Sequence, residues 1–478
     1  MTEENYDIIV IGAGSAGLSV GLTMSKLGFK VLMIARTEHD IGGECLNDGC
    51  VPSKALIHVS KSIKNARKAT AFGLSISGNA DLKKAMKYVY ERQEIIRKHE
   101  NVKALQEEGI IVAFGEARFT GKKEVEVNNK KYTGKNIVIA TGSKPRQLNV
   151  PGVEKVTYYT NHNIFSIKDL PENILIIGGG PIGIEMAQTL NSFNIKVTVV
   201  QHGAKILEHD DEQVTSVLLR YLQKEGIEIL LNADVEEFSA SDIAVIRMKD
   251  GTQRELTFNA VYVGIGRDLT LEPLQLQQAG IDTKDHKIVI DKYLRTTNKN
   301  VFVCGDIAGD LMFSHAAEFH ARILVNNLLS PLKKKLNNEH MSWVTFTDPE
   351  IATFGLNEKQ LEQRGISYKK LVQDFSVDDR AITDDYQDAR MILYISKGNF
   401  FNKEKLLGGT MVAPNAGELI QELILVNTSG LSINAIFNKI YPYPVASRVN
   451  QHLIVKHKEK SISAFVRSVL QITYKLFG

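Results

Sequence analysis

Cysteine is scarce in this chain. Only Cys45, Cys50 and Cys304 occur among 478 residues. Three cysteines are too few for the disulfide framework that holds small secreted proteins together. The N-terminus is acidic and leads directly into a strand-like run, without the basic start and separate apolar segment of a secretory signal. These features favour a reducing, cytoplasmic location.

Long apolar runs and broad basic regions are also missing. We find no run of about 18 apolar residues, so no membrane-spanning helix is expected. The net charge is +3, and five basic side chains against Glu459 alone give residues 452–478 a charge of +4. The rest of the chain is therefore close to neutral. Nucleic-acid binding needs a broad basic face, so we expect no nucleic-acid partner. The length suits about three domains of about 150 residues each.

Two glycine-rich turns stand out against this background. Residues 6–18 read YDIIVIGAGSAGL and contain Gly12, Gly14 and Gly17, while residues 174–185 read ILIIGGGPIGIE and contain Gly178, Gly180 and Gly183. Each turn follows an apolar strand pattern and precedes a helix pattern. In a dinucleotide-binding turn, the first glycine makes the tight turn, the second admits the pyrophosphate, and the third lets the helix pack on the strand. The two copies predict two dinucleotide sites.

The strands that follow the two turns match as well. KVLMIA ends at Ala35 and KVTVVQ ends at Gln201, each 23 residues after the first glycine of its turn. We interpret this as an internal repeat of a βαβ unit. Ala35 and Gln201 occupy the position where an acidic residue usually binds the ribose hydroxyls. Glu38, in the next loop, is a candidate for the first ribose.

The nicotinamide nucleotide is predicted from the second copy. A neutral Gln201 removes a carboxylate that would repel a 2′-phosphate, and His202 and Lys205 follow it as groups that would attract one. NADPH is therefore favoured as the donor. Glu208 argues the other way, so NADH stays open.

Cys45 and Cys50 lie in the glycine-flanked run GGECLNDGCVPSK, residues 42–54. A zinc site usually needs four ligands, and no second pair of cysteine or histidine residues lies nearby in the sequence, so no metal site is expected. A structural disulfide closing so small a loop would stabilise the chain little, and the cytoplasm would reduce it. A redox-active pair accounts best for the spacing and for the place beside a dinucleotide-binding unit.

The run GG-x-C-x-N-x-G-C-x-P-S-K resembles the redox-active signature of the flavin-dependent pyridine nucleotide–disulfide oxidoreductases. This family includes glutathione reductase, dihydrolipoamide dehydrogenase and mercuric reductase. Further stretches resemble the family in the same order along the chain, namely IVIATGSKPR (137–146), VYVGIGRD (261–268), VFVCGDIAG (301–309), FTDPEIATFGL (346–356) and LLGGTMVAPNAGELI (406–420). The resemblance runs from about residue 6 to about residue 455.

The resemblance implies an α/β architecture with two Rossmann-like domains, one for FAD and one for NAD(P)H, and an α+β dimerisation domain. The expected domains are an FAD domain (1–147), an NAD(P)H domain (148–270), a second FAD or central part (271–340), and a dimerisation domain with a basic amphipathic tail (341–478). It implies a homodimeric enzyme that uses FAD and a nicotinamide nucleotide.

The resemblance also implies roles for individual residues. Cys50 would be the thiolate against the flavin, Cys45 the outer sulfur that meets the substrate, and Lys54 a cation near the flavin that pairs with Glu185. A cation there would stabilise a reduced, anionic flavin. Asp306 would hold the ribityl chain. The matching motifs make further residues candidates for cofactor contacts, namely Ser15, Gly43, Thr141, Gly142 and Gly266.

The sequence departs from the family near its C-terminus. Disulfide reductases carry a His-Pro-Thr stretch whose histidine, oriented by a glutamate, shuttles protons to the substrate thiol. Aligned on the prolines of KIYPYPVASRVNQ (439–451), the histidine position holds Tyr443 and the glutamate position holds Arg448. A tyrosine with a pKa of about 10 is a poor proton shuttle near neutral pH. Glutathione reductase and dihydrolipoamide dehydrogenase activities are therefore disfavoured.

Tyr441-Pro442-Tyr443 is similar to mercuric reductase, in which a tyrosine of a Pro-Tyr pair meets the metal ion. That family also delivers the ion through a C-terminal cysteine pair, whereas no cysteine follows Cys304 here. Soft metal ions such as Hg(II), hypothiocyanite-type oxidants, polysulfides and quinones stay open as acceptors. The alternative functions are an NAD(P)H:quinone or diaphorase-type reductase and a dihydrolipoamide dehydrogenase-like enzyme. Tyr443 has two interpretations, as an acceptor contact or as packing across the dimer interface, and Arg448 likewise attracts an anion or forms an interface salt bridge.

The last residues form a pattern of their own. Residues 461–477 place apolar side chains at helical spacing after a lysine-rich stretch, which predicts a basic amphipathic helix. Packing on the body or on the partner subunit is the favoured interpretation. Peripheral membrane binding is the alternative.

Overall fold

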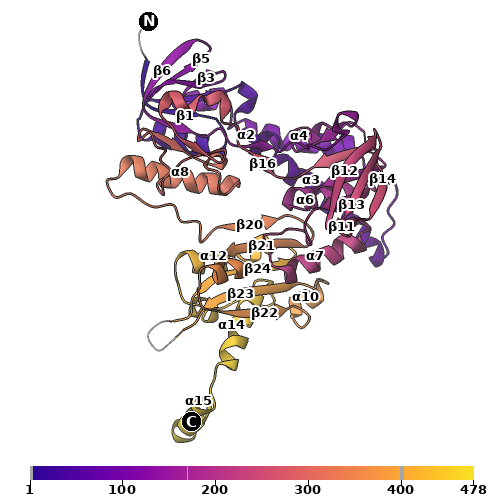
Figure 1. Cartoon of the computed structure of the whole chain (residues 1–478). Helices are drawn as coiled ribbons and strands as arrows, with labels where there is room; N and C mark the ends of the chain where they lie inside the picture. The colour runs from indigo at the N-terminus through magenta and orange to yellow at the C-terminus, as the bar shows by residue number, and fades with distance from the viewer. Residues whose placement is uncertain (1–3, 170, 399–402) are drawn as a thin grey trace. The chain divides into compact units, whose positions relative to one another are not determined.

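The computed structural model describes residues 4–169, 171–398 and 403–478, and the chain forms two units (Figure 1). The first unit contains the described residues up to Val200 together with Ala233–Asn337. The second contains Gln201–Asn232 and Asn338–Gly478. The two are described separately below.

The first unit is built on a largely parallel sheet in the order β3-β2-β1-β6-β5-β4, with β19 also paired to β6. Its strands are β1 (Glu4–Ile11), β2 (Val31–Ala35), β3 (Ile111–Phe114), β4 (Arg118–Gly121), β5 (Glu124–Val127), β6 (Lys130–Ile139) and β19 (Val301–Val303). Ile8 pairs with Val31 and Ile9 with Ile137 in parallel register. The central strands are continuous Val/Ile/Leu runs because both faces of a parallel sheet are covered, and here α1 (Ser15–Lys26) packs beside α8 (Ser314–Leu329).

A second parallel sheet in the same unit repeats this plan. The strands β10 (Lys196–Gln201), β9 (Asn173–Ile177), β15 (Ala260–Val263) and β8 (Tyr158–Tyr159) lie in that order. β9 leads through a glycine turn into α6 (Pro181–Asn191) and on to β10, which pairs in parallel with β9, as β2 does with β1. The predicted repeat of a βαβ unit is confirmed by this topology.

The remaining elements of the first unit are helices that follow β2 and short antiparallel ribbons. The helices are α2 (Gly43–Asn47), α3 (Cys50–Lys68), α4 (Leu82–Arg97) and α5 (Val102–Glu107). The ribbons are β7 (Lys144–Pro145) with β16 (Arg267–Asp268), β17 (Thr283–Lys284) with β18 (Lys287–Ile288), and the meander β12 (Ala233–Ala240), β13 (Ile243–Met248) and β14 (Gln253–Thr257).

The second unit centres on an antiparallel sheet in the order β20-β21-β24-β23-β22. Its strands are β20 (Ser342–Thr345), β21 (Glu350–Gly355), β22 (Tyr368–Asp374), β23 (Arg390–Ser396) and β24 (Leu406–Ala413). α7 (Glu212–Lys224) contacts this sheet, and β11 (Glu228–Leu231) follows α7 in the chain. The other helices are α9 (Glu358–Gln363), α10 (Asp379–Thr383), α11 (Ala416–Leu419), α12 (Gln421–Thr428), α13 (Asn434–Phe437), α14 (Arg448–Lys460) and α15 (Ala464–Phe477).

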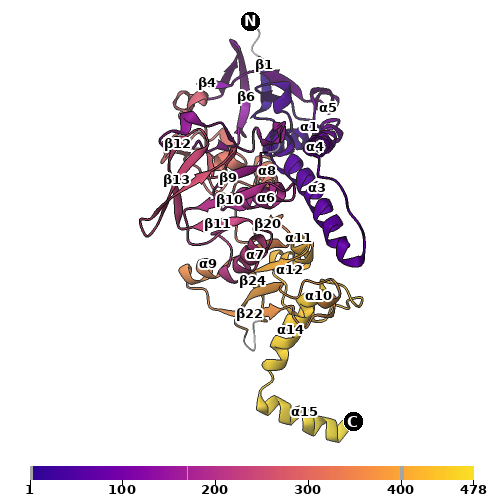
Figure 2. The same ribbon diagram turned by 90° about the vertical axis from the view of Figure 1, so that its right-hand side faces the viewer.

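The predicted amphipathic helix at the end of the chain is α15, which extends beyond α14 and away from the sheet of its unit (Figures 1 and 2). Every residue of α15 is exposed. The favoured expectation is packing on the body or on the partner subunit. Packing on the body of its own chain is wrong, because the apolar side chains of α15 have no cover there, and packing on the partner subunit stays a prediction. Within the described part of the chain, no helix is long and apolar enough to cross a membrane.

Candidate active site

In both glycine turns, backbone atoms lie too close together for a side chain to fit between them. A Cβ at Gly12 would lie 2.2 Å from the carbonyl oxygen of Ala140, and one at Gly17 would lie 1.9 Å from that of Gly12. The second copy repeats this crowding, at 2.3 Å for Gly178 and 2.0 Å for Gly183. Only glycine allows each helix to start this close to the neighbouring strand.

The middle glycine of each turn has more open space around it, and this space shows whether a dinucleotide fits. A Cβ at Gly180 would meet nothing within 4 Å, and one at Gly14 would approach only the Cα of Gly43, at 3.5 Å. Gly14 and Gly180 are the N-cap residues of α1 and α6, and neither has a side chain that could cap its helix. Unpaired backbone N–H groups at a helix start attract an anion. Both turns therefore fit a pyrophosphate.

The two cysteines lie at neighbouring helix starts. Cys45 is half-buried in α2, and Cys50 is the first residue of α3; both are thiols in the structure. The Sγ of Cys50 lies 3.3 Å from the Oγ of Ser314, at the start of α8. The helix start of α3 adds the positive end of its dipole to the surroundings of Cys50.

The surroundings of the two thiols shift their pKa values in opposite directions. A hydrogen bond from Cys45 lowers the pKa of Cys50 to about 6 despite burial, with help from Ser314 and from the charge of Lys54. The same hydrogen bond, together with burial, raises the pKa of Cys45. The reduced pair therefore holds one thiolate, on Cys50, and one thiol, on Cys45, at neutral pH.

Lys54 lies one helical turn beyond Cys50 and forms an ion pair with α6. Its Nζ donates to the Oε2 of Glu185 at 2.7 Å, and Glu185 is 5% exposed. The pair links the helix that carries the redox cysteines to the helix of the second glycine turn. It holds a positive charge near Cys50.

A polar network that the sequence did not predict surrounds Asp306. Ser143 donates to the Oδ2 of Asp306 at 2.6 Å, and the Nε of Arg267 donates to the Oγ of Ser143 at 2.6 Å. Burial raises the pKa of Asp306, while Ser143 and Arg267 act against this. A half-buried carboxylate with one hydroxyl donor keeps acceptor capacity for a polyol chain such as that of FAD.

Arg267 joins this network to the redox helix. Its Nη1 donates to the Oε1 of Glu44 at 2.6 Å, and its Nη2 contacts the other oxygen of the same carboxylate. Asn161 also donates to Glu44, and the Nε2 of His162 lies 3.9 Å away. Burial opposes ionisation of Glu44, yet His162 and Arg267 hold its pKa below the usual range. Glu44 directly precedes Cys45, so the network fixes the start of α2.

Arg267 was within reach of sequence reasoning because it lies in the quoted stretch VYVGIGRD. Glu44 occupies the variable position of GG-x-C, and Asn161 and His162 lie in a loop without a recognisable motif. Contact between these segments depends on tertiary structure alone.

The other predicted cofactor residues of the first unit lie around the same turns. Ser15 begins α1 and its hydroxyl interacts with Cys45. Thr141 and Gly142 lie two and three residues after the end of β6. Gly266 precedes β16, and its backbone oxygen accepts a hydrogen bond from the backbone N–H of Arg146 at 3.0 Å. Their roles toward a cofactor stay predictions.

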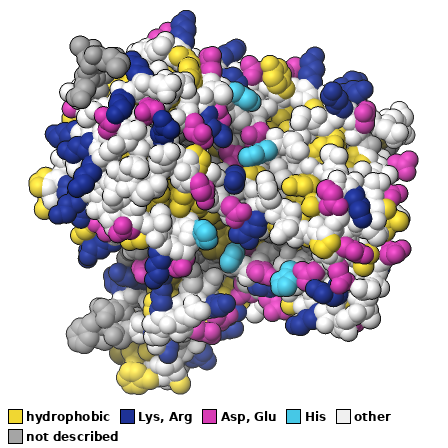
Figure 3. Space-filling model, turned by 45° about the horizontal axis from the view of Figure 1, so that its top comes forward, with side chains coloured by type: hydrophobic (Ala, Val, Ile, Leu, Met, Phe, Trp, Pro, Cys, Tyr) yellow, Lys and Arg dark blue, Asp and Glu magenta, His cyan; other side chains and the backbone are white. Residues whose placement is uncertain are grey.

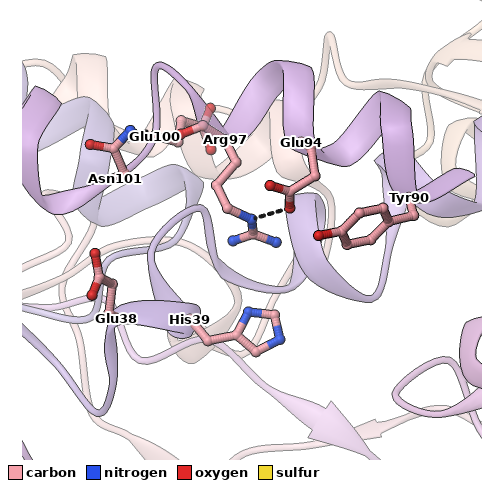
Figure 4. Close-up of a pocket in the computed structure, with 7 residues that line it drawn as sticks. All are labelled: Glu38, His39, Tyr90, Glu94, Arg97, Glu100 and Asn101. Carbon is pink, nitrogen blue, oxygen red and sulfur yellow. Dashed lines mark hydrogen bonds and ion pairs between the residues drawn. The ribbon is translucent and has the colours of Figure 1, made fainter.

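Glu38 lies in a single 3₁₀ turn (Glu38–Asp40) after β2, where it lines a cavity of about 360 Å³ (Figure 4). His39 lies beside it, and the opposite wall comes from α4 and the residues after it, namely Tyr90, Glu94, Arg97, Glu100 and Asn101. In Figure 4, Arg97 turns toward Glu94, with which it forms an ion pair at 3.0 Å. The predicted contact of Glu38 with a ribose stays a prediction.

Gln201 is the last residue of β10 and the first residue of the second unit. Gln201 and the residues after it are the groups expected to select the nicotinamide nucleotide. The Nε2 of Gln201 donates to the Oε1 of Glu208 at 3.1 Å. The Nζ of Lys205 donates a hydrogen bond to the backbone oxygen of Asp210 at 2.5 Å. His202 lies next to Gln201 in the chain. The carboxylate of Glu208 beside Gln201 weakens the predicted attraction for a 2′-phosphate, and so does the engagement of Lys205 with Asp210.

Tyr443 also lies in the second unit and is 67% exposed. Its hydroxyl donates to the Oδ2 of Asp379 at 3.0 Å, and this contact raises its pKa. The guanidinium of Arg448 lies 5.3 Å from the centre of the Tyr443 ring. Tyr441 donates to Glu422 at 2.6 Å, and burial with this hydrogen bond raises its pKa as well. Both phenols are therefore neutral at physiological pH.

No group of three or more histidine, cysteine, aspartate or glutamate side chains in the described ranges is placed to hold a metal ion. Positive and negative side chains are intermixed over the face of the molecule shown in Figure 3.

Comparison with known proteins defines the class. Residues 6–321 match the pyridine nucleotide-disulphide oxidoreductase family, and residues 341–453 match the dimerisation domain of that family. The chain belongs to this family. The predicted fold class, family and cofactor classes are confirmed: the protein is an FAD-dependent oxidoreductase that uses NAD(P)H and carries a domain that supports a homodimer.

The individual relatives have two different activities. A mercuric reductase of Bacillus cereus is 30% identical over 443 residues, which cover 92% of this chain and 69% of the relative. A dihydrolipoyl dehydrogenase of Mycoplasma genitalium is 30% identical over 456 residues, covering 93% and 97%. Among solved structures, the HOCl-induced flavoprotein disulfide reductase RclA from Escherichia coli has a TM-score of 0.82 and 24% identity, covering 94% of this chain and 99% of that one. That likeness shows the same fold.

Proposed function

We propose that this protein passes electrons from NADPH to the Cys45–Cys50 pair and on to a small thiol-reactive acceptor. Soft metal ions such as Hg(II), hypothiocyanite-type oxidants and polysulfides are the candidate acceptors. The observation that carries the proposal is the division of charge between the two sulfurs, with a stabilised thiolate at Cys50 and a thiol at Cys45. Such a pair is prepared to exchange electrons by sulfur chemistry.

Each residue has a defined task in this proposal. Bound FAD would accept a hydride from the nicotinamide and deliver two electrons to the disulfide. Lys54, held by Glu185, and Ser314 stabilise the negative charge that remains on Cys50. Glu44, through Arg267, fixes the helix start that carries Cys45, the sulfur proposed to meet the acceptor.

The environment of Tyr443 supports acceptors that need no proton from the enzyme. A phenol whose pKa is raised by Asp379 is a poor proton shuttle near neutral pH. A soft cation changes one thiolate ligand for another without general acid catalysis. A polysulfide releases a shorter polysulfide anion when a thiolate attacks it. Hypothiocyanous acid loses its hydroxyl group, which takes a proton from solvent and leaves as water, and the second sulfur then displaces thiocyanate as a stable anion. We propose Tyr443 as a neutral contact for the acceptor.

NADPH is the proposed donor because a neutral Gln201 occupies the position of the usual ribose-binding acid, with His202 beside it. Glu208 is the group that opposes this preference, since its carboxylate contacts Gln201. The preference is therefore small.

The decisive experiment compares acceptors in the wild-type holoenzyme and in the variant Cys45→Ser. Under anaerobic conditions, NADPH should make both cysteines of the wild type available for alkylation, as counted by mass spectrometry. Turnover with Hg(II) or polysulfide should fall at least a hundredfold in Cys45→Ser, because the outer sulfur is lost. Cys304→Ser is the matched control. Cys304 is fully buried directly after β19, so this variant should leave turnover unchanged.

The alternative function predicts a different result. If quinones are reduced equally fast by the wild type and by Cys45→Ser, while thiol-reactive acceptors give no turnover, the flavin acts directly and the protein is a quinone or diaphorase-type reductase. The dithiol proposal would then be abandoned.

A further inference from the structure

The helix α15 carries a broad apolar face that its own chain leaves uncovered. Every residue from Lys460 to the end of the chain is exposed. Phe465 is 77% exposed, Leu470 56% and Phe477 87%. Burying large apolar side chains is the main favourable contribution to association in water, so such a face is expected to bind something.

The polar residues of α15 are confined to one stripe. Arg467, Gln471 and Lys475 are spaced four residues apart, and Ser468 lies next to them on the helix surface. The remaining surface is apolar, formed by Phe465, Val466, Val469, Leu470, Ile472, Tyr474, Leu476 and Phe477 together with Thr473. A wide apolar face bordered by a narrow cationic stripe is the pattern of helices that lie in the plane of a membrane surface.

Charge distinguishes among the surfaces that this helix would bind. α15 contains Arg467 and Lys475 but no aspartate or glutamate, and exposed Lys456 and Lys460 precede it at the end of α14. Lys458 is half-buried and donates to the Oδ1 of Asn434. Only Glu459 carries a negative side chain in this stretch. A cationic rim around an apolar face matches a surface that is apolar within and anionic at its edge.

We propose that α15 is a peripheral anchor that binds the chain to an anionic lipid bilayer. The helix would lie parallel to the surface, with Phe465, Val469 and Leu476 among the acyl chains and with Arg467 and Lys475 among the phosphates. It has 14 residues, so its length is about 21 Å, which suits an interfacial helix and not a span. The family match ends at residue 453, so the anchor lies outside the part of the chain shared with the family.

The test uses the full-length holoenzyme and vesicles of phosphatidylcholine alone or with phosphatidylglycerol. Cosedimentation should show binding to the anionic vesicles at least tenfold tighter than to the neutral ones, and the binding should weaken as salt is raised, because salt screens the charges. Equal binding to both kinds of vesicle, or no binding to either, would overturn the proposal.

Two neighbouring substitutions separate insertion from charge. Val469→Glu places a carboxylate on the apolar face, and Ser468→Glu places the same charge on the polar stripe. Insertion predicts a loss of binding of about thirtyfold or more for Val469→Glu, but only about fivefold for Ser468→Glu. Equal losses for the two variants would mean that the apolar face does not enter the bilayer, which would contradict the proposal.

A second copy of the chain is the competing occupant of this face. The oligomeric state of Val469→Glu, measured by light scattering, should equal that of the wild type, and turnover with a soluble acceptor should be unchanged. Dissociation of the dimer in this variant would show that α15 packs between copies, and the anchor proposal would fail. As a further readout, Phe465→Trp should shift its fluorescence to shorter wavelength with anionic vesicles, against the constant background of Trp343. An unshifted spectrum counts against insertion.

Discussion

Cys50 and Tyr443 are both weak acids, and their surroundings act on them in opposite directions. At the start of α3, hydrogen bonds from Cys45 and Ser314 and the charge of Lys54 favour the ionised sulfur. In the second unit, the carboxylate of Asp379 accepts a hydrogen bond from the Tyr443 hydroxyl and favours the neutral phenol. The chain thus stabilises a negative charge at Cys50, where electrons are proposed to arrive, and opposes one at Tyr443, which is proposed to contact the acceptor.

The largest expected effect on this contrast comes from Lys54→Met. Loss of the cation should raise the pKa of Cys50 above about 6 and lower turnover at least a hundredfold. It should also lower the free energy of unfolding by about 2 kcal/mol, because Glu185 is buried and loses its ion-pair partner Lys54. The pH dependence of Cys50 alkylation in the reduced protein and chemical denaturation measure these two effects.

Glu185→Gln is the matched variant for that prediction, and its effect on Cys50 has the opposite sign. The charge of Glu185 raises the pKa of Cys50, so removing it should lower that pKa further. If both variants move the pKa in the same direction, the proposed electrostatic control of Cys50 by this pair is wrong.

Ser314→Ala should have an intermediate effect. The Ser314 hydroxyl lies 3.3 Å from the Cys50 sulfur and favours the thiolate, so its loss should raise the pKa of Cys50 by about half a unit to one unit. In the wild type, alkylation of Cys50 should fall to half as the pH drops to about 6, and in the variant this midpoint should lie at higher pH. Ser314→Thr keeps the hydroxyl and should restore the wild-type midpoint.

Tyr443→Phe should have a smaller effect. If the phenol is a neutral contact, its loss should lower kcat/KM for a soft metal acceptor by about tenfold and leave the pH profile of turnover unchanged. Asp379→Asn, which removes the carboxylate but keeps Tyr443, is the control and should retain most of the activity. A shifted pH profile in Tyr443→Phe would instead make the phenol a proton donor.

The smallest expected effect concerns the nucleotide. Glu208→Gln removes the carboxylate that contacts Gln201 and should raise the ratio of kcat/KM for NADPH over NADH by about fivefold, because repulsion of a 2′-phosphate is relieved. Glu212→Gln, at the start of α7, removes a charge without that contact and should leave the ratio unchanged. An unchanged ratio in Glu208→Gln would place the selectivity elsewhere.

Much of the fold was predictable because its signals are local. Strand, glycine turn and helix follow one another within about 30 residues in each βαβ unit, and hydrophobic periodicity with glycine spacing reports directly on such contiguous units. The paired cysteines and Lys54 are also local, lying within a single run. Glu185, in contrast, was paired with Lys54 only through the family resemblance.

The network around Arg267 was not predictable, and the thiolate on Cys50 was expected only through the family resemblance, without the contacts that favour it. Glu44, Ser143, Asn161 and Asp306 lie far apart in the chain, and no periodicity connects a variable position in α2 with loops that follow β6 and β8. The pKa difference between Cys45 and Cys50 depends on their mutual hydrogen bond and on Ser314, which comes from the distant helix α8.

The sequence by itself determined the two glycine turns, the close spacing of Cys45 and Cys50, the Tyr443 and Arg448 side chains near the C-terminus and the amphipathic pattern of residues 464–477, because each depends on neighbouring residues. Tertiary structure alone decided which contacts separate the pKa values of the two thiols, how Glu44 is held, and that α15 is left uncovered by its own chain. The physical reason is the same in all three cases: burial, hydrogen bonding and exposure depend on segments that meet only when the chain folds.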